Sequence, residues 1–178
     1  MVRDPDPPAI RPGNAVACFS MVLLTYDGRY LLLERSAGKR FAPGRWTGLG
    51  GRVEPGEFDD LHSAALRELT EETGLTAEDV TAFALRRVLL HNRPGAPLTL
   101  LLYFTGRLVE MVTPACPEGT LHWATEEEIS GLDVIENTAG VLPLLIDDLA
   151  AEPDGIDRPR VGAAHYQPNG ELEQIVWA

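Results

Sequence analysis

Residues 50–75 of the chain, GGRVEPGEFDDLHSAALRELTEETGL, are rich in carboxylates, and three of these glutamates end a segment that is expected to be helical. Residues three and four apart are neighbours on a helix, so Glu68 lies beside both Glu71 and Glu72. Each such like-charge pair costs a helix roughly 0.2–0.5 kcal/mol. A solvated acidic face is the plain alternative. Grouped carboxylate oxygens, however, are the ligands that hard divalent cations such as Mg²⁺ prefer, and a cation would reverse the repulsion.

The sequence also indicates how this acidic helix begins and ends. Asp60 is a suitable N-cap, and Gly74 is a suitable left-handed stop after a helix that runs to about Thr73. A glycine pair and a short extended piece at 46–51 precede it, and a basic loop, SAGKRFAPGR, precedes that piece. The acidic cluster is therefore expected in a strand–loop–helix context.

The remaining elements favour a mixed α+β domain with helices packed on a sheet. Asp27-Gly28 predicts a hairpin turn, and Asn169-Gly170 predicts a closing hairpin over 162–177. Thr125 and Glu128 form a capping box at the start of a second helix. A third helical pattern covers 137–150, with a proline that is tolerable only in the first turn. Further strands are expected at 15–24, 30–34, 81–90, 98–109 and 120–123.

Composition narrows the classes of function. The 178-residue chain has a net charge of −12, which argues against binding a nucleic-acid polymer but allows a small anionic ligand beside a metal. Cys18 and Cys116 offer no disulfide framework, which favours a reducing compartment. The apolar run at 15–24 is too short to span a bilayer. We expect a flexible arm at 1–13, a single domain at 14–178, no membrane association and a cytoplasmic location.

The stretch resembles the signature of the Nudix hydrolases. Gly51 and Glu57 fit its first half, and residues 67–75, RELTEETGL, match the Arg-Glu-aliphatic-x-Glu-Glu-x-Gly-aliphatic second half at every specified position. The departure is the spacer, because nine residues separate Glu57 from Arg67, two more than in the family pattern. Asp59 would hold the family spacing when counted back from the helix. We favour Glu57 because Gly51 and Gly56 frame it.

The resemblance implies a Nudix-type mixed β-sheet sandwiched between helices, with a C-terminal β-hairpin. It also implies Mg²⁺-dependent hydrolysis of a nucleoside diphosphate linked to another group, with Mn²⁺ as the alternative ion. Glu68 is the candidate general base, and Arg67 and Glu57 complete the candidate catalytic set. The candidate metal ligands are Gly51, through its carbonyl, and Glu68, Glu71, Glu72 and Glu118.

The segment FAPGRWTGLGGRVEPGE resembles the branch that hydrolyses oxidised purine triphosphates such as 8-oxo-dGTP, the MutT-type branch. In that comparison Arg35 and Arg52 match phosphate-binding cations, although surface charge is the alternative. Asn137 matches a residue that contacts the base, with a helix N-cap as the alternative. Thr47 stands where a well-known subgroup has asparagine, and it is kept as a candidate substrate contact.

The function that we expect is hydrolysis of a nucleoside triphosphate to a monophosphate and pyrophosphate. Two alternatives stay open: hydrolysis of ADP-ribose, nucleotide sugars or dinucleoside polyphosphates, and a catalytically silent nucleotide-binding module. The expected partner is a small nucleotide, and the protein is expected to be a monomer or a homodimer.

Overall fold

A computed structural model describes residues 16–155 and 158–178, so the arm expected at 1–13 lies outside the described residues. The described chain forms an eight-stranded mixed sheet in the order β3-β2-β1-β5-β4-β7-β8, with β6 paired to β2. The strands are β1 (Val16–Tyr26), β2 (Arg29–Arg35), β3 (Trp46–Thr47), β4 (Val80–His91), β5 (Leu98–Leu108), β6 (Gly119–Ala124), β7 (Arg160–Tyr166) and β8 (Leu172–Trp177). The helices are α1 (Leu61–Thr73), α2 (Glu126–Ile129), α3 (Glu136–Ala139) and α4 (Leu142–Ala151).

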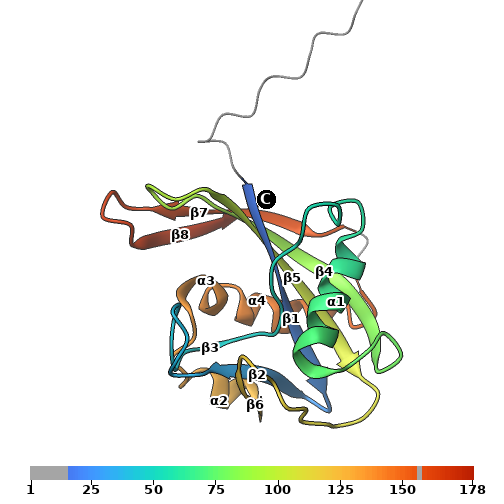
Figure 1. Ribbon diagram of the computed structural model, residues 1–178. Coiled ribbons are helices and arrows are strands. Elements are labelled where there is room, and N and C mark those ends of the chain that lie inside the picture. The colour runs from blue at the N-terminus through green and yellow to red at the C-terminus, as the bar shows by residue number, and fades with distance from the viewer. Residues whose placement is uncertain (1–15, 156–157) are drawn as a thin grey trace, which may run out of the picture.

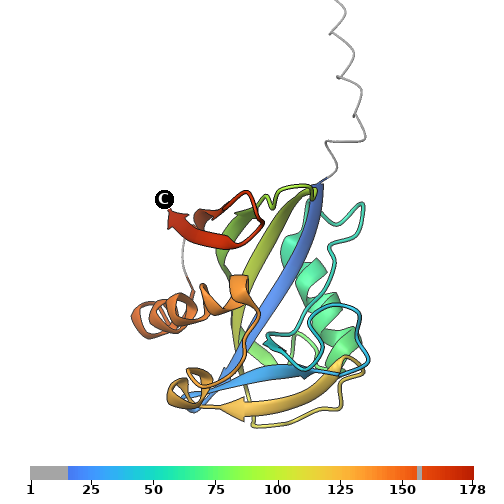
Figure 2. The same ribbon diagram turned by 90° about the vertical axis from the view of Figure 1, so that its left-hand side faces the viewer.

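Helices cover both faces of the sheet, as the sequence predicts (Figures 1 and 2). On one face, Ala64, Ala65 and Leu69 of α1 pack into a core with β1, β2 and β5. On the other face, α4 packs with α2 against a second group of buried residues that includes Leu23 of β1. The expected α+β sandwich is confirmed.

Strand β1 lies in the middle of this sheet. Residues 21–24 are all buried, because successive side chains of a strand point to opposite faces and both faces of β1 are covered. It pairs with β5 in parallel over most of its length, from Val16 beside Leu98 to Thr25 beside Arg107. The uninterrupted apolar run at the start of the chain is therefore a central strand.

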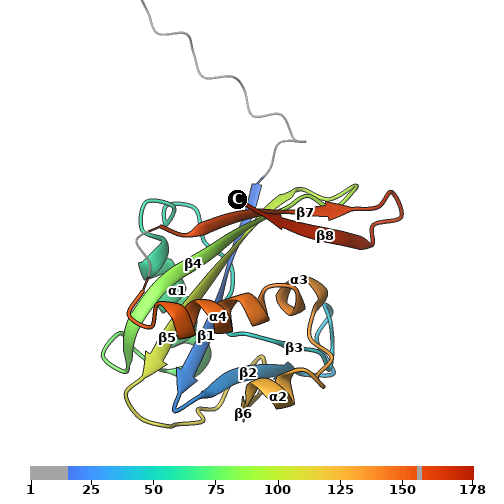
Figure 3. The ribbon, with the colours of Figure 1, turned by 180° about the vertical axis from the view of Figure 1, so that it is seen from behind.

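Both predicted hairpins are present. Asp27 (φ 46°) and Gly28 (φ 73°) are left-handed, as the tight turn between β1 and β2 requires. Gly170 (φ 84°) lies in the turn between β7 and β8, whose hairpin extends the sheet by parallel pairing of β7 with β4. This hairpin passes over α3 (Figure 3), where an added Cβ on Gly140 would come within 2.9 Å of the Ile175 side chain.

The helical pattern at 137–150 proves to be two helices. Helix α3 is a single turn, and a turn at Gly140 and Val141 separates it from α4. Pro143 lies in the first turn of α4, where its missing N–H has no intrahelical partner to lose. None of the described helices is long and apolar enough to cross a membrane.

The glycine-rich segment 48–53 covers the part of β1 that its short pairing with β2 leaves open on that side. The N–H groups of Ser20 and Val22 donate to the carbonyls of Gly51 (2.8 Å) and Leu49 (2.7 Å), and Val53 donates to the Cys18 carbonyl (3.0 Å). Regular strand structure ends at Thr47, so the extended piece expected at 46–51 is only partly a strand. The backbone of the glycine pair is nevertheless fixed along β1.

A buried ion pair joins α4 to the sheet. Asp148 accepts two hydrogen bonds from Arg87 of β4, at 2.7 and 2.9 Å, and it also contacts Arg160 of β7. Both Arg87 and Asp148 are almost fully buried, and the Arg87 guanidinium lies over the Trp177 ring at 4.7 Å. This cluster fastens α4 and the C-terminal hairpin to the same strand.

Replacing Asp148 by alanine leaves the buried Arg87 without its anion and removes one of the two carboxylate partners of the half-exposed Arg160. We expect Asp148→Ala to lower the free energy of unfolding by about 3–5 kcal/mol in urea titrations. Asp147→Ala is the matched control, because Asp147 is exposed in the same helix, and its effect should stay within about 0.5 kcal/mol. Equal effects of the two substitutions would contradict a stabilising role for the buried pair.

Candidate active site

Helix α1 is held at both ends by the predicted caps. Asp60 accepts hydrogen bonds from the Ser63 N–H (3.1 Å) and hydroxyl (2.6 Å). Gly74 is left-handed (φ 75°) and donates its N–H to the Thr70 carbonyl. Because the alanines and Leu69 bury one face of the helix, its glutamates are left at the edge beside the glycine segment.

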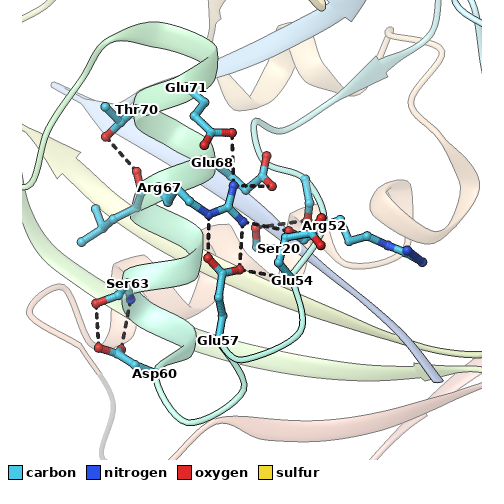
Figure 4. Close-up of polar contacts among 12 residues, drawn as sticks. Ser20, Arg52, Glu54, Glu57, Asp60, Ser63, Arg67, Glu68, Thr70 and Glu71 are labelled. Atoms are coloured by element: carbon cyan, nitrogen blue, oxygen red, sulfur yellow. Dashed lines mark hydrogen bonds and ion pairs between the residues drawn. The ribbon is translucent and has the colours of Figure 1, made fainter.

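The Arg67 guanidinium is the centre of the acidic group (Figure 4). Its Nε and Nη2 donate to the two Glu57 oxygens at 2.6 and 2.9 Å. Its Nη1 donates to Glu68 (2.9 Å) and Glu71 (3.1 Å), and Nη2 also reaches the Arg52 carbonyl (3.1 Å). The arginine hydrogen bonds hold the pKa of Glu57 below its usual range, and the glutamates raise the pKa of Arg67. One cation thus organises three carboxylates.

The two-residue insertion is absorbed in the loop before the helix. Glu57 donates its N–H to the Glu54 carbonyl, Asp60 donates to the Glu57 carbonyl, and both turns close at 3.1 Å. The Glu57 carboxylate also accepts from the Glu54 N–H (2.7 Å). Within the described ranges, the Asp59 side chain makes no hydrogen bond or ion pair. Glu57 therefore reaches Arg67 despite the longer spacer.

Glu72 lies partly buried beside the first glycine of the pair. Its Oε2 accepts from the Gly50 N–H at 2.8 Å. Burial raises the pKa of Glu72 to about 7, the Gly50 hydrogen bond opposes this rise, and the charges of Glu118 and Glu68 add to it. A neutralising cation at this point would favour the ionised form.

Glu68 faces the second glycine. A Cβ built on Gly51 would overlap the Glu68 carboxylate, so the absence of a side chain at this position lets the two groups meet. Glu68 Oε1 is engaged by Arg67, and no hydrogen bond to its Oε2 occurs in the described chain. One oxygen of Glu68 is therefore fixed and the other is free beside the glycine backbone.

Glu118 approaches the group from the loop before β6. Lys39 donates to its carboxylate at 2.6 Å, and the Ser36 N–H and hydroxyl donate to its carbonyl at 3.0 and 3.1 Å. The Glu118 carboxylate is close enough to raise the pKa of Glu72. The structure thus brings the predicted loop carboxylate toward the helix, with Lys39 as its present partner.

The carboxylate oxygens of the acidic group are chemically suited to a hard cation, but their side chains are not arranged as a preformed metal site. Across residues 16–155 and 158–178, no group of three or more His, Cys, Asp or Glu side chains is arranged to hold a metal ion. Arg67 and Lys39 hold Glu68 and Glu118 instead. All the acidic side chains offer oxygen, which suits Mg²⁺, and Mg²⁺ keeps several waters and takes few carboxylates.

The glycine segment forms one wall of a cavity of about 850 Å³. It lies between the sheet, α3 and the β7–β8 hairpin, and Gly50 and Gly51 form the wall nearest to the acidic group. Its size is in the range that small-molecule sites occupy. Its wall includes Arg35, Phe41, Thr47, Tyr103, Asn137 and Tyr166.

The four predicted substrate contacts are placed differently around this cavity. Arg35, Thr47 and Asn137 line it, and the charge of Arg35 is close enough to lower the pKa of Glu72. The Arg52 guanidinium is not in the cavity wall but lies over the Phe19 ring at 5.5 Å, and Phe19 lines the cavity. Figure 4 shows the Arg52 side chain directed away from Arg67.

Sequence reasoning missed several aromatic residues of the wall. Phe41 is 64% exposed at the cavity, and Arg35 donates to its carbonyl at 3.0 Å. Tyr103 comes from β5, and Tyr166 comes from the C-terminal hairpin and packs edge-on against His91. In the sequence, the one feature that could have identified Phe41 as a wall residue is its position as a large aromatic in the basic loop SAGKRFAPGR.

Comparisons with known proteins agree with this architecture. The family model described as NUDIX domain matches residues 15–145. The chain is 44% identical over 59 residues to the oxidized purine nucleoside triphosphate hydrolase of Danio rerio, covering 33% of this chain and 35% of that protein. It is 39% identical over 66 residues to the nucleoside triphosphatase NudI of Salmonella arizonae, covering 36% and 45%. The matches thus span less than half of these curated relatives. The crystal structure of a MutT protein from Bacillus halodurans aligns with a TM-score of 0.63 at 23% identity, covering 90% of this chain and 97% of that one.

The Glu72 environment predicts an unusual dependence of stability on pH without metal. With a folded-state pKa of about 7 and an ordinary value of 4.5, folded Glu72 keeps a proton that the unfolded chain has released between these pH values. Its contribution to stability therefore falls as pH rises from about 4.5 to about 7, by roughly 3 kcal/mol. Urea titrations in EDTA should show this fall for the wild type and a smaller one for Glu72→Gln. Parallel profiles for the two proteins would contradict the assignment.

Gly51→Ala tests the contact between the glycine and Glu68. Gly51 has no left-handed φ, and the added Cβ meets the flexible end of a side chain, so folding should be little affected. The Glu68 carboxylate must move, and Mg²⁺ affinity measured by calorimetry should fall about 10–100-fold. Gly38→Ala is the matched control, because nothing lies within 4 Å of its added Cβ. Unchanged Mg²⁺ affinity in Gly51→Ala would refute the importance of this contact.

Proposed function

The chain belongs to the NUDIX domain family, and we propose that it hydrolyses a nucleoside triphosphate to a nucleoside monophosphate and pyrophosphate with the help of Mg²⁺. The observation that carries the proposal is the junction at the glycine pair. Gly50 hydrogen-bonds to Glu72 on one side, and both glycines line the 850 Å³ cavity on the other. A nucleoside in the cavity would therefore have its phosphates beside the acidic group.

The charges around this junction suit such an orientation. Arg35 lines the cavity at the end near Glu72, where a phosphate chain would need a cation. Arg52, over the Phe19 ring and outside the cavity wall, is the second candidate cation for the phosphates. The opposite end of the cavity is lined by aromatic and amide side chains, which suit a base.

The acidic group supplies oxygen ligands for the cation. Glu68, Glu71, Glu72 and Glu118, together with the Gly51 carbonyl, would hold Mg²⁺ or, as the alternative, Mn²⁺. A bound divalent ion neutralises phosphate charge and lowers the pKa of a coordinated water. Arg67 would keep the carboxylates in place, since it already bonds to Glu57, Glu68 and Glu71.

Glu68 is our candidate for the general base. Its Oε1 is fixed by Arg67 while Oε2 stays free, so one oxygen can accept a proton from water without loss of the arginine contact. Glu57 would act by positioning Arg67 and the loop, because both of its oxygens bond to that guanidinium. Its role is therefore to maintain geometry.

An oxidised purine nucleotide such as 8-oxo-dGTP is the proposed substrate class. The similarity to the Danio rerio protein, whose name includes oxidized purine nucleoside triphosphates, supports it. Asn137 and Thr47 line the cavity and offer polar contacts for a base. Of these two candidate base contacts, Asn137 has the longer side chain and therefore the greater reach toward a base.

The function is tested by pyrophosphate release. Purified protein with Mg²⁺ should release pyrophosphate from an oxidised or normal purine nucleoside triphosphate, and it should do so faster than it cleaves ADP-ribose, nucleotide sugars or dinucleoside polyphosphates. Glu68→Gln and Glu72→Gln should each lower kcat at least about 100-fold. Asp59→Asn is the control with unchanged kcat, because its side chain has no partner in the described chain.

Two outcomes would contradict the proposal. Wild-type turnover in both glutamine variants would remove the acidic group from the reaction. Binding of nucleotides without hydrolysis of any of them, with Mg²⁺ present, would favour a silent nucleotide-binding module instead.

A further inference from the structure

The ion pair between Lys39 and Glu118 links the basic loop to the acidic group. The Lys39 ammonium donates to the Glu118 carboxylate at 2.6 Å. The two side chains are 31% and 32% exposed, so water and ions can reach the pair. In the part of the chain that the structure describes, the Lys39 side chain makes no other hydrogen bond or ion pair. Among the candidate metal ligands, Glu118 is the one that comes from outside the glycine segment and α1. One ion pair therefore governs whether this loop carboxylate is available to a metal ion.

Lys39 is the only lysine among the 15 lysine and arginine residues of the chain. An ammonium is a compact charge on a flexible stem, whereas a guanidinium holds a carboxylate through a rigid fork. Both kinds of contact occur in this site. Arg67 binds both oxygens of Glu57, at 2.6 and 2.9 Å, while Lys39 binds a single oxygen of Glu118. The lysine contact is therefore the easier of the two to exchange for another cation.

The backbone keeps Glu118 beside the basic loop without help from the ion pair. The Ser36 N–H and hydroxyl donate to the Glu118 carbonyl at 3.0 and 3.1 Å. The Ser36 carbonyl in turn accepts from the Lys39 N–H at 3.1 Å. These bonds do not involve either charged group. The Lys39 ammonium can therefore release the carboxylate while the two loops stay joined.

The charges in the site favour such an exchange. Glu118 is close enough to Glu72 to disfavour the ionised form of that carboxylate, and Glu68 acts in the same direction. A single ammonium compensates one of these charges. A divalent ion supplies twice the charge and can contact several carboxylates at once, which one ammonium on a loop does not do.

We propose that Lys39 is a positioning residue that competes with the divalent ion for Glu118: it holds the carboxylate in the metal-free protein and releases it when the ion binds. This inference rests on the metal-binding part of the proposed function, because the carboxylate passes from the ammonium to the ion. It accounts for the finding that the described acidic side chains suit a metal chemically without forming a preformed site.

The first test measures Mg²⁺ affinity by calorimetry, at low ionic strength and without nucleotide. Lys39→Met removes the competing charge, so Mg²⁺ should bind about twofold to fivefold more tightly than to the wild type. Lys39→Arg should return the affinity to the wild-type value or below it, because a guanidinium also holds a carboxylate. Arg40→Met is the matched control: it removes the same charge from the next residue, which is exposed and makes no hydrogen bond or ion pair in the described chain. Its effect should stay below about twofold, because a charge without a direct partner is screened by solvent.

The second test follows the lysine itself in the wild-type protein and needs no substitution. As the chain has one lysine, acylation by an amine-reactive ester, read by peptide mass spectrometry, reports on Lys39 alone, with the N-terminal amine as the internal reference. The ion pair shields the amine, so Mg²⁺ should raise the rate of Lys39 acylation several-fold. In Glu118→Gln the rate should be high without Mg²⁺ and should not change when it is added.

Two results would overturn the inference and leave the proposed function standing: equal Mg²⁺ affinity in the wild type and Lys39→Met, or Lys39 acylation that Mg²⁺ does not accelerate. A wild-type protein that binds no Mg²⁺ would overturn both. Failure of the proposed function alone looks different, because Mg²⁺ would then still bind and release Lys39 while no nucleotide yields pyrophosphate.

Discussion

The acidic site depends on one guanidinium. If Arg67 were absent, the carboxylates of Glu57, Glu68 and Glu71 would repel one another across a short loop and the edge of the helix. With it, the three carboxylates share a cation through four hydrogen bonds between 2.6 and 3.1 Å. The same arginine bonds to the Arg52 carbonyl, which ties the glycine segment to the helix. The geometry of the site is thus organised by protein contacts before a metal is considered, and this arrangement makes its acidic density compatible with folding.

The glycine segment then connects two different kinds of environment. On the side of α1 it meets charged oxygens, and on the side of α3 it borders a largely aromatic and apolar cavity. Hydrogen bonds to β1 fix its backbone, while the lack of side chains at Gly50 and Gly51 allows both environments to approach it. A ligand with an anionic end and a planar end matches this division without rearrangement of the sheet.

The sequence was sufficient for features that depend on local chemistry. The caps at Asp60 and Gly74, the turn at Asp27-Gly28 and the acidic helix all follow from neighbouring residues, and the structure contains them. The sandwich architecture came from the family resemblance. The break between α3 and α4 was missed because the apolar pattern continues through Gly140. Tyr103 was missed because the hydrophobic pattern of a strand does not reveal which face a cavity occupies.

The position of β1 has a consequence for how the chain becomes a folded protein. Its most extensive pairing is with β5 and begins with Val16 beside Leu98. The centre of the sheet can therefore form only after the β5 segment has been synthesised. Among the described strands, β1 is thus an apolar segment whose main neighbour comes much later in the chain, while the short hairpin with β2 and the glycine segment are its nearer partners. Parallel pairing between distant segments closes a large loop before it yields contacts, which slows folding and prolongs exposure of apolar surface. The topology that places the glycine segment beside its central strand is therefore also one that favours slow folding and transient exposure of apolar surface.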